Sequence, residues 1–160
     1  MGKVLFLDID GPMIPGRAYL LRNQTRNPFV TVFDPIAVDM VNKICEDRGY
    51  KIVLHSSWIR TKFIGRGDIK GDVHDHLIDQ GINPEHLHED VYCCRDTSWR
   101  YDRIKKWLEN HPEVTHFVIL DDEAPEHGDD IARNVLLIDF DEGLTLKNFR
   151  QIVDGTWPRR

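Results

Sequence analysis

Three short segments of the chain place polar side chains directly after an apolar run, and these side chains can do chemistry together. Carboxylate oxygens are ligands that suit Mg²⁺, and hydroxyl groups can donate hydrogen bonds to phosphate oxygens. Two acids held close together repel each other unless a proton or a cation intervenes. Such a set of groups fits phosphoryl transfer, in which positioning and electrostatic stabilisation do most of the work. The residues are Asp8 and Asp10, Ser56 and Ser57, and Asp121 and Asp122.

The apolar runs in front of these residues are typical of strands buried on both faces. They cover residues 4–7, 51–55 and 116–120. In a parallel sheet the carboxyl ends of the strands lie along one edge, and ligands of open α/β sheets bind there. The sequence therefore predicts that the carboxylates and hydroxyls meet at this edge and bind a cation.

The rest of the chain alternates between helical and extended patterns. Asp34 and Pro35 are typical of a helix start, apolar residues follow at helical spacing, and Gly49 supplies the stop. Further predicted elements are helices over about 72–80 and 99–110 and after Thr145, and strands near 88–93 and over 135–140. This alternation predicts an α/β fold with a doubly wound, Rossmann-like and mostly parallel sheet.

Length and composition narrow the possibilities. The 160 residues are 41% apolar and 30% charged, which predicts one globular domain over 1–160. No apolar stretch approaches the length of a membrane span, and three cysteines, two of them adjacent, make a reducing cytoplasm the simplest setting. The net charge of −6 argues against long sequence-independent contacts with nucleic acid, which usually need a basic face.

Residues 12–33 contain several prolines and scattered arginines, which predicts a loop or a small flap. Arg17 lies in this stretch, and more cations follow in the loop after Trp58. A local basic pocket is therefore compatible with the acidic net charge. Two interpretations of the flap arginines stay open: they are solvated, or they clamp a phosphate or nucleotide over the site.

The motifs, taken in order, resemble those of the haloacid dehalogenase (HAD) phosphatases. The likeness rests on Asp-Ile-Asp-Gly at 8–11, Ser56 after a strand, a basic residue within 100–106, and Asp121 and Asp122 after another strand. Within that superfamily the chain is similar to HAD domains of the Swiss Army Knife RNA-repair type, through stretches that span almost the whole sequence. The resemblance implies a HAD-like fold with a minimal cap, and phosphatase activity.

The resemblance also implies how the acids divide the work. Asp8 is implied as the nucleophile that forms an aspartyl-phosphate. Asp10 is implied as the group that protonates the leaving oxygen and then activates the water that hydrolyses the intermediate. Mg²⁺ is the implied cofactor, with Asp8, the backbone carbonyl of Asp10, Asp121 and Asp122 as its ligands.

Substrate binding is implied for a second group of residues. Ser56 is implied to hold a phosphate oxygen. Gly11, Ser57 and Arg17 are further candidates for contacting the substrate, because they lie in or near the same motifs.

The cation of the third motif has more than one candidate. Arg100 is favoured by its position near the predicted helix start, whereas Lys105 is the residue type that the superfamily uses more often. Lys106 ranks behind both. The sequence also departs from the family at His55, which precedes Ser56 where an apolar residue is usual.

The spacing of the motifs leaves no room for a large independent cap. An open site of this kind suits a nucleotide or the terminal phosphate of a nucleic acid, and we predict a Mg²⁺-dependent phosphomonoester hydrolase for such substrates. A phosphatase for small metabolites and a catalytically silent nucleotide-binding module are the alternatives. The sequence does not indicate an oligomeric state.

Overall fold

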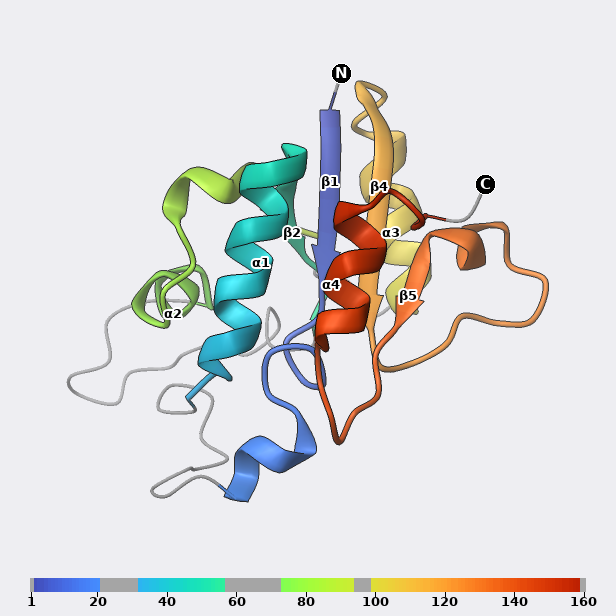
Figure 1. Ribbon diagram of the computed structural model, residues 1–160. Helices are drawn as coiled ribbons and strands as arrows, with labels where there is room; N and C mark the ends of the chain where they lie inside the picture. Colours follow the sequence, from blue (N-terminus) through green and yellow to red (C-terminus); the bar gives the residue numbers. More distant parts are fainter. Residues whose placement is uncertain (1, 21–31, 57–72, 94–98, 159–160) are drawn as a thin grey trace, which may run out of the picture.

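The structure, a computed structural model, describes residues 2–20, 32–56, 73–93 and 99–158. At its centre lies a five-stranded sheet with all strands parallel, in the order β3-β2-β1-β4-β5 (Figure 1). The strands are β1 (Gly2–Leu7), β2 (Lys51–Leu54), β3 (Leu87–Tyr92), β4 (Val114–Asp121) and β5 (Val135–Leu137).

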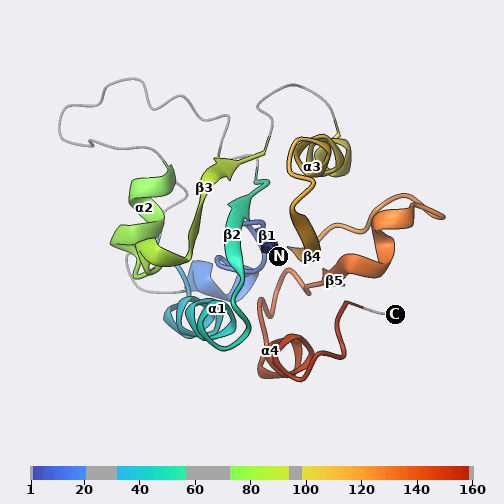
Figure 2. The ribbon, with the colours of Figure 1, turned by 90° about the horizontal axis from the view of Figure 1, so that it is seen from above.

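Helices lie on both faces of this sheet (Figure 2). They are α1 (Pro35–Arg48) and α4 (Leu146–Val153) on one face, α3 (Arg100–Glu109) on the other, and α2 (Val73–Asp79) beside β3. Within the described ranges, every helix is too short or too polar to cross a membrane. Helices on both faces of a parallel sheet make a doubly wound α/β fold, so the predicted fold class is confirmed.

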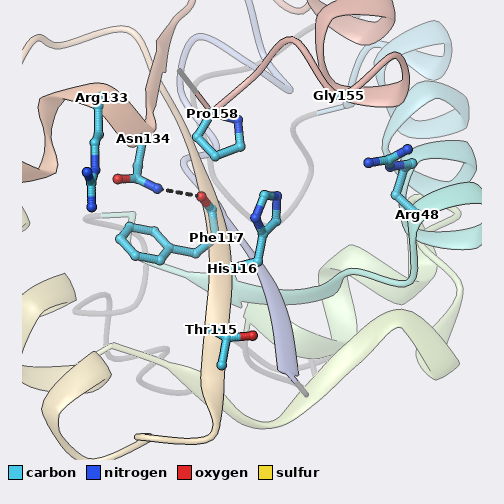
Figure 3. A pocket seen from close by; sticks show the side chains of 8 residues that line it. All are labelled: Arg48, Thr115, His116, Phe117, Arg133, Asn134, Gly155 and Pro158. Atoms are coloured by element: carbon cyan, nitrogen blue, oxygen red, sulfur yellow. Dashed lines mark hydrogen bonds between the residues drawn. The ribbon is translucent and has the colours of Figure 1, made fainter. Parts of the chain in front are cut away.

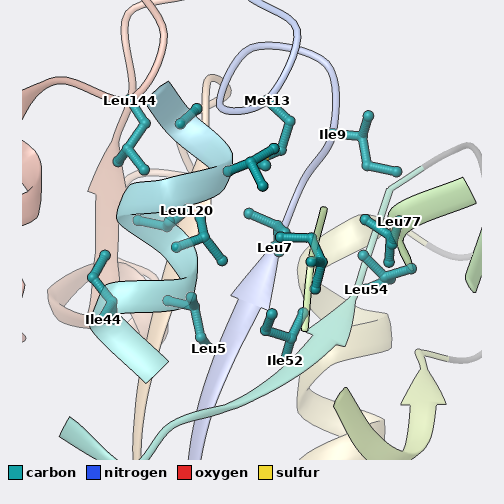
Figure 4. Packing of buried hydrophobic residues seen from close by; sticks show 14 of the residues in the cluster. Leu5, Leu7, Ile9, Met13, Ile44, Ile52, Leu54, Leu77, Leu120 and Leu144 are labelled. Carbon is teal, nitrogen blue, oxygen red and sulfur yellow. The ribbon is translucent and has the colours of Figure 1, made fainter. Parts of the chain in front are cut away.

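The central strand β1 divides the core because successive side chains of a strand point to opposite faces. Leu5 and Leu7 belong to the larger apolar cluster, which packs against α1 and α4 (Figure 4). Phe6 belongs to the smaller cluster on the α3 side, where its ring meets that of Trp107 edge-on with centroids 5.4 Å apart. Both faces of β1 are therefore buried, as its unbroken apolar run predicts.

The helix boundaries follow the capping residues that the sequence offers. The carboxylate of Asp34 accepts a hydrogen bond from the backbone of Ile36 at 3.0 Å, and Gly49 ends α1 in the left-handed conformation. Thr145 and Asn148 cap α4 reciprocally, each side chain accepting from the other residue's backbone N–H. These short-range signals are why both helices start where the sequence predicts.

Some segments differ from their prediction. β5 is shorter than predicted, because after Leu137 the chain turns around the side chain of Asp139, which accepts from the backbone of Asp141 and Glu142. The described residues also contain 3₁₀-helices that the sequence analysis did not predict: η1 (Gly16–Leu20), η3 (Pro84–His86) and η4 (Asp130–Asn134). The predicted flap over 12–33 is described only in part, and Trp58 and the loop after it lie outside the described residues.

The order of the strands creates a switch point between β1 and β4. From β1 the chain moves outward through β2 to β3, and it then crosses to the other side of β1 to form β4 and β5. In open α/β sheets the crevice at such a switch point, outside the carboxyl ends of the strands, is where ligands bind. The fold therefore directs attention to the residues that follow β1 and β4.

Candidate functional site

Asp8 is the first residue after β1 and lies at the switch point. Its backbone N–H donates to the carbonyl of Leu120 on β4 at 3.0 Å, so the end of the strand is fixed against its neighbour. Its carboxylate accepts a hydrogen bond from the backbone N–H of Ile9 at 2.9 Å. Only 4% of the residue is exposed. The sheet thus holds a buried carboxylate in a fixed orientation at the ligand-binding edge.

Asp121 and Asp122, at the end of β4, complete a group of three carboxylates with Asp8. One oxygen from each lies within 4.8 Å of the others. Gly11 makes this approach possible, because a Cβ at this position would lie 2.9 Å from the Cβ of Asp122 and the backbone has a φ of +99°. The glycine that was considered for substrate binding therefore has a definite steric role in the close packing of the turn against Asp122.

The carboxylates strongly influence one another. Burial, and next the charge of Asp121, raise the pKa of Asp8 well above its ordinary value of 3.8. Burial also raises the pKa of Asp122. For Asp121 burial acts in the same direction, yet hydrogen bonds from His55 and Arg100 lower its pKa below the ordinary value. Crowded hard oxygen donors of this kind fit a divalent metal ion, whose charge would relieve the repulsion.

Arg100, the first residue of α3, is the cation at this edge. Its Nη1 lies 2.7 Å from each carboxylate oxygen of Asp121 and 3.4 Å from Oδ2 of Asp8. Its Nη2 lies 2.9 Å from the carboxylate of Glu123. The side chain is 20% exposed, so it can reach a ligand that enters from solvent. The guanidinium of Arg100 therefore lies beside the carboxylates of Asp8 and Asp121, at the start of α3.

Lys105, the other main candidate for that cation, lies elsewhere. Its Nζ contacts the carboxylates of Asp129 at 2.8 Å and Asp130 at 3.4 Å. An α-helix turns by about 100° per residue, so a side chain five positions after Arg100 points about 140° away from it. The structure therefore places Lys105 beside Asp129 and Asp130 and away from the acidic edge, and a catalytic role for it stays a prediction.

Ser56 and Asp10 also lie at this edge of the sheet. β2 pairs with β1 as far as Leu7 and Leu54, and the backbone of His55 still donates to the carbonyl of Leu7 at 3.3 Å. Ser56 follows directly and is buried. Asp10 is half-buried in the turn after β1, and its carboxylate is not one of the group of three. Ser57 lies outside the described residues.

Arg17 has a different environment from the one that a phosphate clamp requires. Its guanidinium pairs with the carboxylate of Asp34, and its Nε donates to the carbonyl of Glu142 at 3.0 Å. These contacts tie η1 to the start of α1 and to the loop before α4. The described contacts of Arg17 therefore favour an anchoring role over a substrate-binding one.

His55 is a residue of the site whose role sequence reasoning missed. It is fully buried, and its Nε2 lies 2.9 Å from Oδ2 of Asp121. An ionised carboxylate only accepts hydrogen bonds, so the pair with Asp121 is a hydrogen bond in which Nε2 of His55 donates. The departure from an apolar residue at this position was the available signal, but its partner is 66 residues away in the sequence.

The comparison with family models decides what kind of domain carries this site. The model of the HAD domain in Swiss Army Knife RNA repair proteins matches residues 4–149. The chain belongs to this HAD family. Comparisons with curated proteins and with solved structures found no match.

Membership of the HAD family agrees with the geometry of the acidic edge. It indicates a hydrolase of the phosphatase type, and HAD enzymes generally use a divalent metal. The matched segment includes the turn after β1, the end of β2, the start of α3 and the end of β4. All of the elements that form the acidic edge therefore lie within the family match.

Proposed function

We propose that this HAD domain is a Mg²⁺-dependent phosphomonoester hydrolase that acts through an aspartyl-phosphate on nucleotides or on the terminal phosphates of nucleic acids. The observation that carries the proposal is the position of Asp8, buried beside Asp121 and Asp122 and contacted by Arg100 at the switch point of the sheet. A carboxylate held in this way can attack a phosphorus atom without reorganising its surroundings.

The proposed reaction has two steps. In the first, a carboxylate oxygen of Asp8 bonds to phosphorus, the bond from phosphorus to the leaving oxygen breaks, and Asp10 gives its proton to that oxygen. In the second, Asp10 takes a proton from water, the water oxygen bonds to phosphorus, and the bond between phosphorus and Asp8 breaks. Inorganic phosphate leaves, and both acids return to their starting states.

The surrounding residues hold the phosphate and balance its charge. The Asp8, Asp121 and Asp122 carboxylates and the backbone carbonyl of Asp10 would hold Mg²⁺, which supplies positive charge against the transferring phosphate. Arg100 would contribute a second positive charge from the first turn of α3. Ser56, with Ser57 after it, would donate hydrogen bonds to phosphate oxygens.

The family supports the substrate class in this proposal. Its description refers to RNA repair proteins, which makes a nucleic-acid phosphate a natural substrate, and mononucleotides present a similar phosphomonoester. We place this activity in the cytoplasm, because three cysteines, two of them adjacent, suit a reducing compartment. We also propose that residues 1–160 act as one domain with 12–33 as a small flap.

Phosphate release from a panel of substrates tests the proposal. The panel contains nucleoside monophosphates, oligonucleotides with a 3′- or 5′-phosphate, and sugar phosphates, each with Mg²⁺ and with a chelator. We expect Mg²⁺-dependent release from the nucleotide or oligonucleotide members, and none by Asp8→Asn. Preference for sugar phosphates would favour the metabolite phosphatase, and no release from any member would contradict an enzymatic function.

A further inference from the structure

A hollow of about 500 Å³ lies at the opposite end of β4 from the acidic edge. It surrounds the first half of the strand, with Thr115 and His116 at its floor (Figure 3). Asp121 comes five positions after His116, so at about 3.3 Å per residue the two sites lie about 16 Å apart along the strand. A ligand in this hollow therefore does not share the position of the phosphate that Asp8 would attack.

The hollow lies where β5 has not yet begun, because η4 (Asp130–Asn134) precedes Val135, the first residue of β5. β5 pairs only with residues 119–121 of β4, so the earlier part of β4 has no strand on that side. Asn134 covers part of the open edge by donating from Nδ2 to the carbonyl of Phe117 at 2.9 Å. The remaining walls come from α1 and from the chain after α4, where Gly155 lies against the guanidinium of Arg48. The volume lies in the range of small-molecule sites.

Two arginines give this hollow a positive charge. Arg48 lies on the α1 side and Arg133 on the opposite side, with His116 and Pro158 between them (Figure 3). Neither guanidinium has a carboxylate partner among the described residues, whereas Arg17 has one and Arg100 has three. Nε of Arg48 is buried and makes no hydrogen bond there. In a chain with a net charge of −6, two cations that face one hollow without an acid are unusual.

The imidazole of His116 is affected by positive charges near this hollow. Burial, followed by the charges of Lys3 and Arg48, lowers the pKa of His116. The neighbouring hollow of about 230 Å³ shares Arg133 but also contains Asp130, which Lys105 contacts at 3.4 Å. The uncompensated charge is therefore on the Arg48 side of Arg133, and a ligand that supplies the missing negative charge would lie there.

We propose that the hollow between Arg48 and Arg133 is a second, non-catalytic binding site for the phosphate group of a nucleotide unit, free or within a strand. Guanidinium groups present several donors to phosphate oxygens in a fixed geometry. The hydroxyl of Thr115 adds a donor, and the ring of Pro158 and the side chain of Phe117 offer apolar surface for a sugar or a base. This site requires no turnover at Asp8, so it stands or falls separately from the proposed hydrolase.

Titration of the ¹⁵N-labelled full chain in a chelator tests the proposal without catalysis. The probes are inorganic phosphate, adenosine monophosphate and a single-stranded oligonucleotide with hydroxyl ends. We expect saturable shifts of the amide signals of Thr115, His116 and Asn134 with at least one probe. Saturation by the mononucleotide would identify a single nucleotide as the ligand, and saturation by the oligonucleotide alone would identify a strand. No saturable shift with any probe, or shifts confined to the turn after β1, would overturn the proposal.

The double variant Arg48→Gln/Arg133→Gln should bind the same probe about tenfold more weakly or worse, because charged hydrogen bonds to phosphate are lost. A matched control, Lys147→Gln/Arg150→Gln, removes two exposed cations of α4 and should stay within about twofold of the wild type. If the double variant does not fold, Arg133→Gln alone replaces an exposed side chain and should still weaken binding. Equal binding by the arginine variants and the control would contradict the site.

Discussion

The residues around the two ends of β4 carry charges of opposite sign. At the carboxyl end, the carboxylates of Asp8, Asp121 and Asp122 crowd together around one guanidinium, that of Arg100. Around the amino-terminal half, Arg48 and Arg133 face a hollow with no described carboxylate partner. In both places the chain leaves charge uncompensated, and the sign of the charge indicates the sign of the missing ligand. The comparison predicts a cation at one end and a phosphate at the other.

The largest effect should come from removing the cation of the acidic edge. Arg100→Gln should lower kcat/KM by about 10²–10³-fold, since a preorganised charge near the transferring phosphate is lost. Lys105→Gln is the matched control on the same helix. It should change kcat/KM by less than about twofold, because the Lys105 side chain is 39% exposed and contacts Asp129 rather than the acidic edge. Similar losses in both variants, measured by phosphate release, would show that the third-motif cation is misassigned.

A smaller effect is expected from the histidine behind Asp121. His55→Leu removes the buried donor to the Asp121 carboxylate and should weaken Mg²⁺ binding by about 10–100-fold in calorimetry, because such partners orient metal ligands. His55→Gln retains an N–H donor and should recover part of this affinity. If both variants bound Mg²⁺ as the wild type does, His55 would have only a structural role, and metal-free unfolding would be the measurement in which they differ.

The smallest effect concerns the stability of the metal-free protein. Because the pKa of Asp8 is raised in the folded state, the folded chain keeps a proton that the unfolded chain has released. Stability should therefore fall as pH rises from about 4 through the raised pKa. Asp8→Asn abolishes this charge, so its Tm at pH 7 should exceed that of the wild type by a few degrees. For a chain of this size, each kcal/mol of unfolding free energy changes Tm by about 2–4 °C.

The predicted increase in Tm is specific to acids of the acidic edge. Asp39→Asn, an exposed acid on α1, is a matched control and should leave Tm within about 1 °C of the wild type. Asp121 acts at lower pH: its lowered pKa means that its stabilising contribution is present above about pH 4 and is lost below it. A Tm of Asp8→Asn below that of the wild type at pH 7 would show that repulsion does not dominate at this edge.

The sequence predicted the parts of the molecule that depend on neighbours along the chain. Apolar runs that stop at Asp8 and Asp121 identified the two central strands, and the caps at Asp34 and Thr145 identified two helices. Once these strands are parallel, the acids that follow them must meet at one edge. That is why the group of three carboxylates was predictable from a single sequence.

The remaining features depend on residues that are far apart in the sequence. The hydrogen bond of His55 to Asp121 and the ion pair of Arg17 with Asp34 each join residues that the sequence keeps apart. The hollow at the other end of β4 depends on where β5 begins, which is directly after η4. No local sequence pattern predicts such contacts. Only the structure shows that Arg100 and Lys105 have different partners and that Arg48 and Arg133 line the same hollow.

Trapping of the covalent intermediate tests the central claim most directly. The protein is mixed with the best substrate of the panel and Mg²⁺, quenched in acid during turnover, reduced with borohydride and mapped by mass spectrometry. An acyl phosphate on Asp8 would be reduced to homoserine at position 8, which we expect in the wild type and not in Asp8→Asn. Steady phosphate release without this product, together with retained activity of Asp8→Asn, would contradict nucleophilic attack by Asp8.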